Sequence, residues 1–231
     1  MKHLIALVLF SFCIFGCKGK ETSKESSSVP VDEKALNEIL SQNTNSIRGA
    51  WRTDTSYENR FFQISVDIPS DWFLSKGENE QRNEAAADFL SGDDKNLKGV
   101  FSSAIKRTIT VFWAYRYPPG TPGKTNPNIS MVIENIEHLP GIKSEVDYLQ
   151  ALENTLKMSN RSFIFKKPAA RVKIGELELW SRDAEAPIGN LLVKQRFYVY
   201  LKQRTILLMG ATSVSPEDEL ELEKITKSFK A

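Results

Sequence analysis

Four strand-like runs follow one another in the second half of this chain, and their order restricts the folds that the chain can adopt. The runs cover residues 170–174 (ARVKI), 176–185 (ELELWSRDAE), 190–203 (NLLVKQRFYVYLKQ) and 204–213 (RTILLMGATS). They are rich in β-branched and aromatic residues, which favour strands. The KQR sequence at 202–204 predicts a tight turn between the last two. This succession predicts a meander of antiparallel strands.

Two amphipathic helices are expected beside these strands. The first covers 144–159, with Ser144 as its N-cap and a buried stripe made of Val146, Leu149, Leu152 and Leu156. The second begins at Ser215, has Pro216 at its first position, and turns Leu222, Ile225 and Phe229 inward. Strands followed by helices in this order are typical of an α+β fold, an antiparallel β-sheet with packed helices.

Strand patterns also occur in the first half of the chain. Residues 62–68 alternate so that Phe62, Ile64, Val66 and Ile68 share one face, and Pro69 ends that strand. Residues 107–137 predict a hairpin whose tip is the long Pro/Gly loop 118–128. Between these two, Asn83–Leu90 predicts a short helix and the sequence SGDDKN a turn.

The N-terminus has the composition of an export signal. Lys2 and His3 precede an uncharged apolar run at 4–16. As a helix this run would span about 20 Å, which is short of the roughly 30 Å hydrocarbon core of a bilayer. A basic start, a short apolar run and a small residue at its end predict a cleaved signal peptide at 1–16.

The sequence IFGC at 14–17 resembles the bacterial lipobox through Ile14, Gly16 and Cys17, although Phe15 is bulkier than usual. The resemblance implies cleavage before Cys17 and acylation, for example with palmitate, on its sulfur and new N-terminus. The alternative is an ordinary signal peptide with an incidental cysteine. Cys13 would leave with the signal, so the mature chain would form no internal disulfide. Lys18, in place of an inner-membrane retention Asp, favours the outer membrane if the host is Gram-negative.

A tether and a helix are expected before the globular domain. Residues 17–31 are rich in Ser, Lys and Glu, a composition that predicts a flexible segment. Residues 32–47 follow as an amphipathic helix capped by Asp32. Its apolar stripe would pack on the domain or, alternatively, contact a partner or the membrane surface. The α+β domain itself is expected at 48–231.

The start of that domain resembles PsbP-like (DcrB-type) domains. The stretch YENRFFQISVDIPSDWFLSKG matches their opening through Phe61, Phe62, Ile64, Ile68, Pro69 and Trp72. The end is also similar, with two paired strands and a helix that closes with Ser228 and Phe229. The resemblance implies the PsbP-like fold and an accessory or assembly role without enzymatic activity; it implies no cofactor.

Catalytic, metal and nucleic-acid functions find little support. The formal net charge of +2, from 31 basic and 29 acidic residues, indicates no nucleic-acid partner. His138 is the only histidine after the signal region and has no nucleophile motif beside it. Asp88, Asp93 and Asp94 lack calcium-loop spacing and are expected in a turn. We therefore expect neither catalysis nor a metal site.

Two surfaces are candidate binding sites. One is a sheet face on which Arg196, Tyr198 and Tyr200 alternate, with Trp180 from the preceding run. Cross-strand pairing in an exposed sheet explains the same pattern. The other is the long loop, with Tyr115, Tyr117 and Lys124 as contact groups. The alternative there is a variable surface loop.

These observations predict a lipid-anchored, non-enzymatic binding or assembly module of the bacterial cell envelope. Its expected partners are the membrane, through Cys17, and an envelope protein. The alternative function is an envelope lipoprotein that binds or senses a small ligand through the aromatic-basic sheet face.

Overall fold

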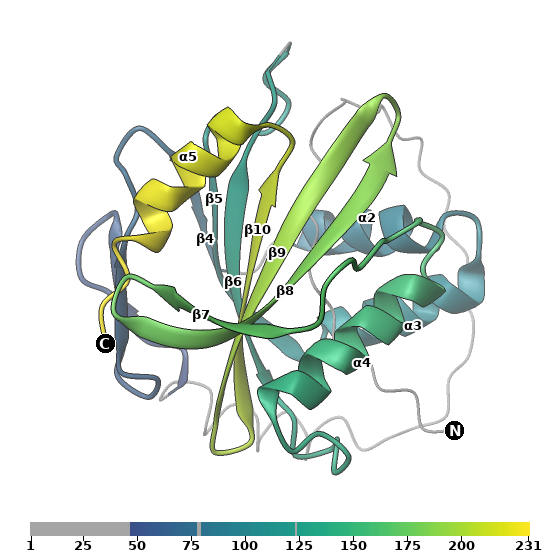
Figure 1. The fold of residues 1–231 in the computed structure, drawn as a ribbon, viewed down its shortest axis with the longest axis horizontal. Coiled ribbons are helices and arrows are strands. Elements are labelled where there is room, and N and C mark those ends of the chain that lie inside the picture. Colours follow the sequence, from purple (N-terminus) through teal and green to yellow (C-terminus); the bar gives the residue numbers. More distant parts are fainter. Residues whose placement is uncertain (1–46, 78–79, 123) are drawn as a thin grey trace.

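The computed structural model describes residues 47–77, 80–122 and 124–231. The predictions for the signal peptide, for Cys17, for the tether and for nearly all of the 32–47 helix lie outside the described residues. The described chain forms two antiparallel sheets with helices on both sides of the larger sheet (Figure 1). The predicted α+β class is confirmed.

The larger sheet has seven strands in the order β4-β5-β6-β10-β9-β8-β7. Its strands are β4 (Phe73–Lys76), β5 (Thr108–Tyr115), β6 (Asn128–Asn135), β7 (Ala170–Ile174), β8 (Leu177–Ile188), β9 (Leu191–Lys202) and β10 (Thr205–Ser213). The expected hairpin at 107–137 and the meander at 170–213 are thus confirmed. Gln203 and Arg204 both have positive φ, 46° and 59°, in the tight turn between β9 and β10. Such φ values are those of a type I′ hairpin turn.

Each face of this sheet has its own apolar core. On one face lie α2 (Glu80–Ser91), α3 (Lys95–Ile105) and α4 (Glu145–Met158). On the other lie α5 (Pro216–Thr226) and the small sheet of β1 (Ala50–Trp51), β2 (Ser56–Asn59) and β3 (Ile64–Asp67). Figure 1 shows the three helices gathered on one side and α5 with the N-terminal strands on the other. Because both faces are covered, alternate residues of one strand enter different cores.

A bulge in β5 shifts this alternation at one point. The register between β5 and β6 changes between Thr110 and Phe112. As a result Val111 and Phe112 both enter the small-sheet core, whereas Trp113 and Tyr115 point to the helices.

The two predicted helices begin where the sequence indicates. The Ser144 side chain accepts from the Asp147 N–H, and Asp147 completes a capping box for α4. The Ser215 side chain accepts from the Asp218 N–H at the start of α5. In α5, Leu222, Ile225 and Phe229 beyond it are buried as expected. In α4 the prediction for Val146 was wrong: it is exposed, and Tyr148 completes the buried stripe with Leu149, Leu152 and Leu156.

Three features were not predicted. The 62–68 strand has the expected buried face, but it pairs with β2 and, with β1 beyond it, forms a separate three-stranded sheet. Helix α3 was missed, although Asp94 caps it through the Asn96 and Leu97 N–H groups. The C-terminus returns to the small sheet, where Ser65 and Lys230 exchange backbone hydrogen bonds. Gly175 allows this approach, because a Cβ there would collide with the Phe229 carbonyl oxygen.

Candidate functional site

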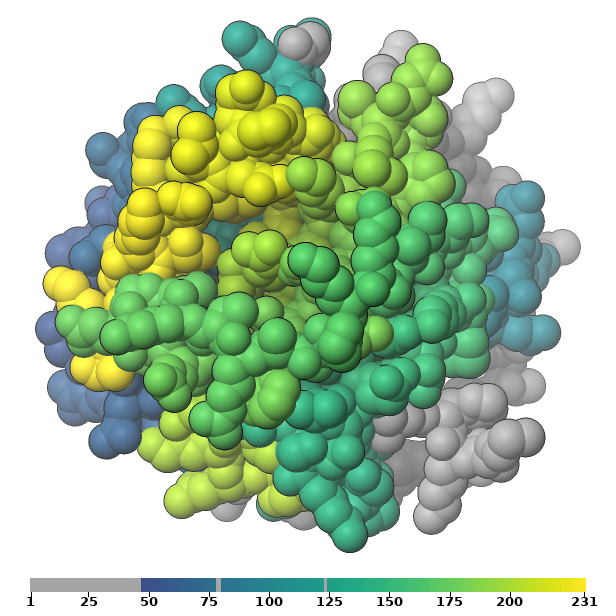
Figure 2. Space-filling view, viewed as in Figure 1, coloured from purple at the N-terminus to yellow at the C-terminus, as the bar shows by residue number. Residues whose placement is uncertain are grey.

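A pocket of about 300 Å³ opens between α5, strands β8–β10 and the segment that leads from α4 to β7. Figure 2 shows the hollow between α5, in yellow, and the green segment that crosses the front of the molecule. The volume lies at the lower end of the range for ligand pockets, ~300–1,000 Å³. The pocket is lined by Ile164, Lys166, Lys167, Asp183, Ala184, Glu185, Lys194, Gln195, Arg196, Tyr198, Ala211, Ser213, Glu219, Leu222, Glu223 and Thr226.

Secondary structure fixes each wall of the pocket. Backbone hydrogen bonds between Ile164 and Glu185 attach the 164–167 segment to the edge of β8. Helix α5 packs on the sheet through Leu222 and Ile225, which places Glu219 and Glu223 along the opposite wall. The floor between these walls comes from β9 and β10.

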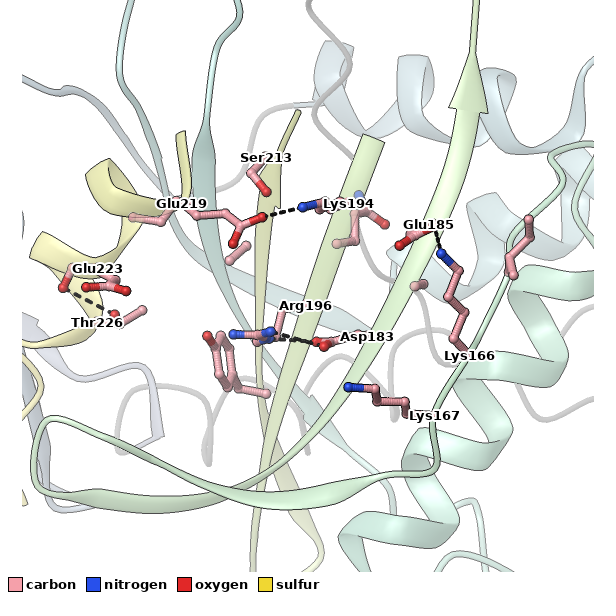
Figure 3. Close-up of a pocket in the computed structure, with 16 residues that line it drawn as sticks. Lys166, Lys167, Asp183, Glu185, Lys194, Arg196, Ser213, Glu219, Glu223 and Thr226 are labelled. Atoms are coloured by element: carbon pink, nitrogen blue, oxygen red, sulfur yellow. Dashed lines mark hydrogen bonds and ion pairs between the residues drawn. The ribbon is translucent and has the colours of Figure 1, made fainter. Parts of the chain in front are cut away.

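Ion pairs join the walls to the floor (Figure 3). The Arg196 guanidinium donates two hydrogen bonds to Asp183, at 2.6 and 3.0 Å. Lys194 donates to Glu219 at 2.7 Å, and the Lys166 ammonium lies 2.6 Å from a Glu185 oxygen. The hydrogen bond from Arg196 to Asp183 raises the pKa of Arg196. These pairs are partly solvated, so each adds only about 0–1 kcal/mol to stability.

Tyr198 lies at the buried end of the pocket. It is 5% exposed, and burial raises the pKa of its hydroxyl, an effect that the nearby Arg196 charge partly offsets. The phenol is therefore protonated at neutral pH. Within the described residues the Tyr198 O–H has no hydrogen-bond acceptor, so it is available to donate.

Lys167 differs from the other cations that line the pocket. Within the described residues it has no hydrogen-bond or ion-pair partner. Figure 3 shows its ammonium pointing into the pocket, toward the Arg196–Asp183 pair.

The structure divides the predicted sheet-face residues. Arg196 and Tyr198 line the pocket, whereas Tyr200 packs beneath the small sheet against Phe62, with ring centroids 6.1 Å apart. Trp180 lies on the opposite face, because it is the register partner of Val199, and it packs on the helix-side core. The predicted grouping of Trp180 with Arg196, Tyr198 and Tyr200 was wrong. Register between strands decides this grouping, and alternation within one strand does not reveal it.

The structure keeps only two of the three predicted contact residues of the loop on a shared surface. Tyr115 is not available for contact, because it is 1% exposed and stacks on Trp113 at 6.1 Å in the helix-side core. Tyr117 and Lys124 do lie together, with the ammonium 5.7 Å from the ring centroid. Asn126 ties the two ends of the loop by bonding both the N–H and the carbonyl of Tyr117. The loop is also attached to α5, because Thr125 donates a hydrogen bond to Asp218 and Arg116 forms an ion pair with Glu221.

The other chemistry-bearing side chains have structural surroundings. His138 is exposed, and its pKa is lowered by partial desolvation and by the nearby Arg107 charge. Asp94 caps α3, and Asp88 forms an ion pair with Lys98. Within the described ranges no three acidic, histidine or cysteine side chains come close enough to hold a metal ion. No helix in this part of the chain is both long and apolar enough to cross a bilayer.

Sequence reasoning missed Lys166, Lys167, Glu219 and Glu223 as pocket residues. A weak signal was present, because the segment 154–175 contains six basic residues and no acidic one. Nothing in the sequence indicated that this segment lies opposite α5.

Three solved structures similar to this chain were found by comparison with known proteins. No family model matches the sequence, and no curated protein matches it. The PsbP protein (CyanoP) of Synechocystis is 10% identical, with 79% of this chain and 96% of that chain covered and a TM-score of 0.43. LpqN of Mycobacterium tuberculosis, a protein involved in cell envelope biogenesis, is 15% identical, with 73% and 82% covered and a TM-score of 0.43.

A structure from Bacteroides thetaiotaomicron is 13% identical to this chain, with a TM-score of 0.39. The match covers 77% of this chain and 48% of that one, so the chain spans about half the length of the Bacteroides protein. Likenesses at these identities and TM-scores carry no argument about function. The PsbP-like resemblance stays a prediction, and the α+β architecture rests on the strand order itself.

Proposed function

We propose that this chain is a lipid-anchored, non-enzymatic binding module of the bacterial cell envelope, and that it holds a small ligand in the pocket between α5 and β8–β10. The observation that carries the proposal is the pocket itself. It is concave, it has a few apolar residues, and polar side chains from β8, β9, β10, α5 and the 164–167 segment converge on it. This combination is typical of small-molecule sites.

The anchoring part of the proposal rests on the sequence. The apolar run at 4–16, the small residue Gly16 and Cys17 together support export and acylation. Each buried methylene of an acyl chain contributes about 0.8 kcal/mol, so several chains would hold the protein on a membrane. Location at the outer membrane is part of the same proposal.

The state of the pocket carboxylates favours binding of a small ligand over catalysis. The four carboxylates that line the pocket each lie beside a cation: Asp183, Glu185 and Glu219 in the pairs described above, and Glu223 with Lys227 at 2.8 Å. They are engaged in holding the walls, which suits a binding site better than acid–base chemistry.

The ligand-binding test is native mass spectrometry of the full chain, extracted from its host membranes in mild detergent. We expect a small molecule to co-purify with the wild type. Ala211→Leu should abolish it, because Ala211 lines the pocket and is 6% exposed. Ala170→Leu, at an exposed position on β7 outside the pocket, is the matched control. A wild type without any bound molecule, or one equally loaded after Ala211→Leu, would contradict the proposal.

The anchoring test is Cys17→Ser in the producing bacterium. We expect the variant to leave the membrane fraction and to lose the acyl mass. Continued acylation after this substitution would rule out Cys17 as the anchor.

A protein partner is a second candidate function. The exposed Lys124 beside Tyr117, on a loop fixed to α5, is a defined surface for such a contact. Affinity purification of wild type and Lys124→Glu from gently solubilised membranes tests it. A stoichiometric envelope protein lost only in the variant would support assembly through this loop.

A further inference from the structure

We propose that the pocket ligand carries an anionic oxygen group, a carboxylate or a phosphate, on a short apolar body. This inference rests on the proposed function, because it names the ligand class for the same pocket. It is carried by the balance of charges and hydrogen-bond donors among the residues that line the pocket.

Among the described residues, the ion pairs leave one cation of the pocket lining without a counter-ion. Asp183, Glu185 and Glu219 are paired with Arg196, Lys166 and Lys194, and Glu223 is paired with Lys227 outside the lining. Lys167 remains, with its ammonium directed into the pocket (Figure 3). A ligand that enters this space therefore meets an uncompensated positive charge.

Hydrogen-bond donors in the pocket also favour an anionic ligand. The Tyr198 O–H has no hydrogen-bond acceptor among the described residues and can donate to a ligand. Arg196 has more N–H groups than Asp183 uses. Together with Lys167, these groups form a set of hydrogen-bond donors from three chain positions. Carboxylate and phosphate oxygens accept strongly from such donors.

The apolar part of the ligand is indicated by the other side chains of the pocket. Ala211 and Leu222 are buried beside Tyr198, and Ile164 lies at the mouth with 48% of its surface exposed. At about 300 Å³ the pocket has room for one small ring or short chain in addition to the anionic group.

The test is isothermal titration of the full acylated chain in detergent with three probes: phenyl phosphate, benzoate and uncharged benzyl alcohol. The variants are Lys167→Glu and Tyr198→Phe. Lys173→Glu is the matched control, because Lys173 is an exposed lysine on β7 outside the pocket and undergoes the same charge change. Far-UV circular dichroism before titration establishes that each variant is folded.

We expect saturable binding of at least one anion and about tenfold weaker binding of benzyl alcohol. Lys167→Glu should weaken anion binding by about fivefold or more, Tyr198→Phe by about threefold, and Lys173→Glu by less than about twofold. The relative affinities of phenyl phosphate and benzoate identify which oxygen group is preferred.

Three results would overturn the inference: no saturable binding of either anion, equal binding of benzyl alcohol, or equal weakening by Lys173→Glu. These results differ from a failure of the proposed function. If a neutral or cationic molecule co-purifies with the wild type and is lost in Ala211→Leu, the pocket remains a binding site and only the anionic class is wrong.

Discussion

Arg182 and Asp183 are neighbours on β8, yet their ion pairs lie on opposite faces of the sheet and differ in burial. Arg182 pairs with Glu153 of α4, and their side chains are 13% and 7% exposed. Asp183 pairs with Arg196 at side-chain exposures of 50% and 52%, in the pocket. The first pair is sealed beneath a helix, while the second can exchange contacts with water or a ligand. Burial, rather than residue type, therefore decides whether an ion pair maintains the fold or serves a site.

The largest effect is expected from Arg182→Met. It leaves the buried Glu153 carboxylate with Lys157 as its remaining cation, at 2.6 Å. We expect a loss of about 3 kcal/mol in the free energy of unfolding, measured by urea denaturation. The double variant Glu153→Met/Arg182→Met should recover most of it, because no charge is then left buried. A loss below about 1 kcal/mol for the single variant would remove the contrast between the two faces.

A second buried acid, on the helix side of the sheet, makes the stability of the fold depend on pH. Glu134 is 1% exposed and accepts a hydrogen bond from the Tyr148 hydroxyl at 2.7 Å. Burial raises the pKa of Glu134 to about 7, from an ordinary 4.5. The folded state therefore holds this proton more tightly than the unfolded chain does. Its contribution to stability is complete below pH 4.5 and is lost as the pH rises through about 7.

Urea unfolding at several pH values tests this dependence. Each pKa unit corresponds to about 1.4 kcal/mol, so the wild type should lose stability between pH 4.5 and 7 relative to Glu134→Gln. Parallel stability curves for the two proteins would show that Glu134 does not titrate in this range.

On the pocket face, Arg196→Met should cost little stability. Both partners of its pair are half exposed, so we expect a change of less than about 1 kcal/mol in urea unfolding. The same variant should weaken phenyl phosphate binding severalfold. A loss of stability as large as that of Arg182→Met would mean that the pocket pair is structural.

The smallest expected effect is a gain in ligand affinity rather than a loss. Asp183→Asn removes the carboxylate that competes for Arg196, so calorimetry should show about twofold to threefold tighter binding of phenyl phosphate with little change in stability. Weaker binding would indicate that Asp183 is needed to hold the Arg196 side chain in position.

The sequence predicted what depends on local patterns. Alternation identified β5, β6 and the four strands from β7 to β10, and the caps at Ser144 and Ser215 located the two main helices. Helix α3 was not predicted, because its short apolar pattern lies between a turn sequence and a strong strand. The separate small sheet was missed because strand pairing involves partners distant in the sequence.

The site depended more strongly on tertiary structure. The sequence alone placed Arg196 and Tyr198 on one strand face, since side chains alternate along any strand. It did not place Trp180 on the far side, Tyr115 in the core or Lys167 opposite α5. Those positions follow from strand register, from the β5 bulge and from the return of the chain along the edge of β8. Local residue types fix the elements and their faces, whereas packing between distant segments decides which faces are buried and which enclose a pocket.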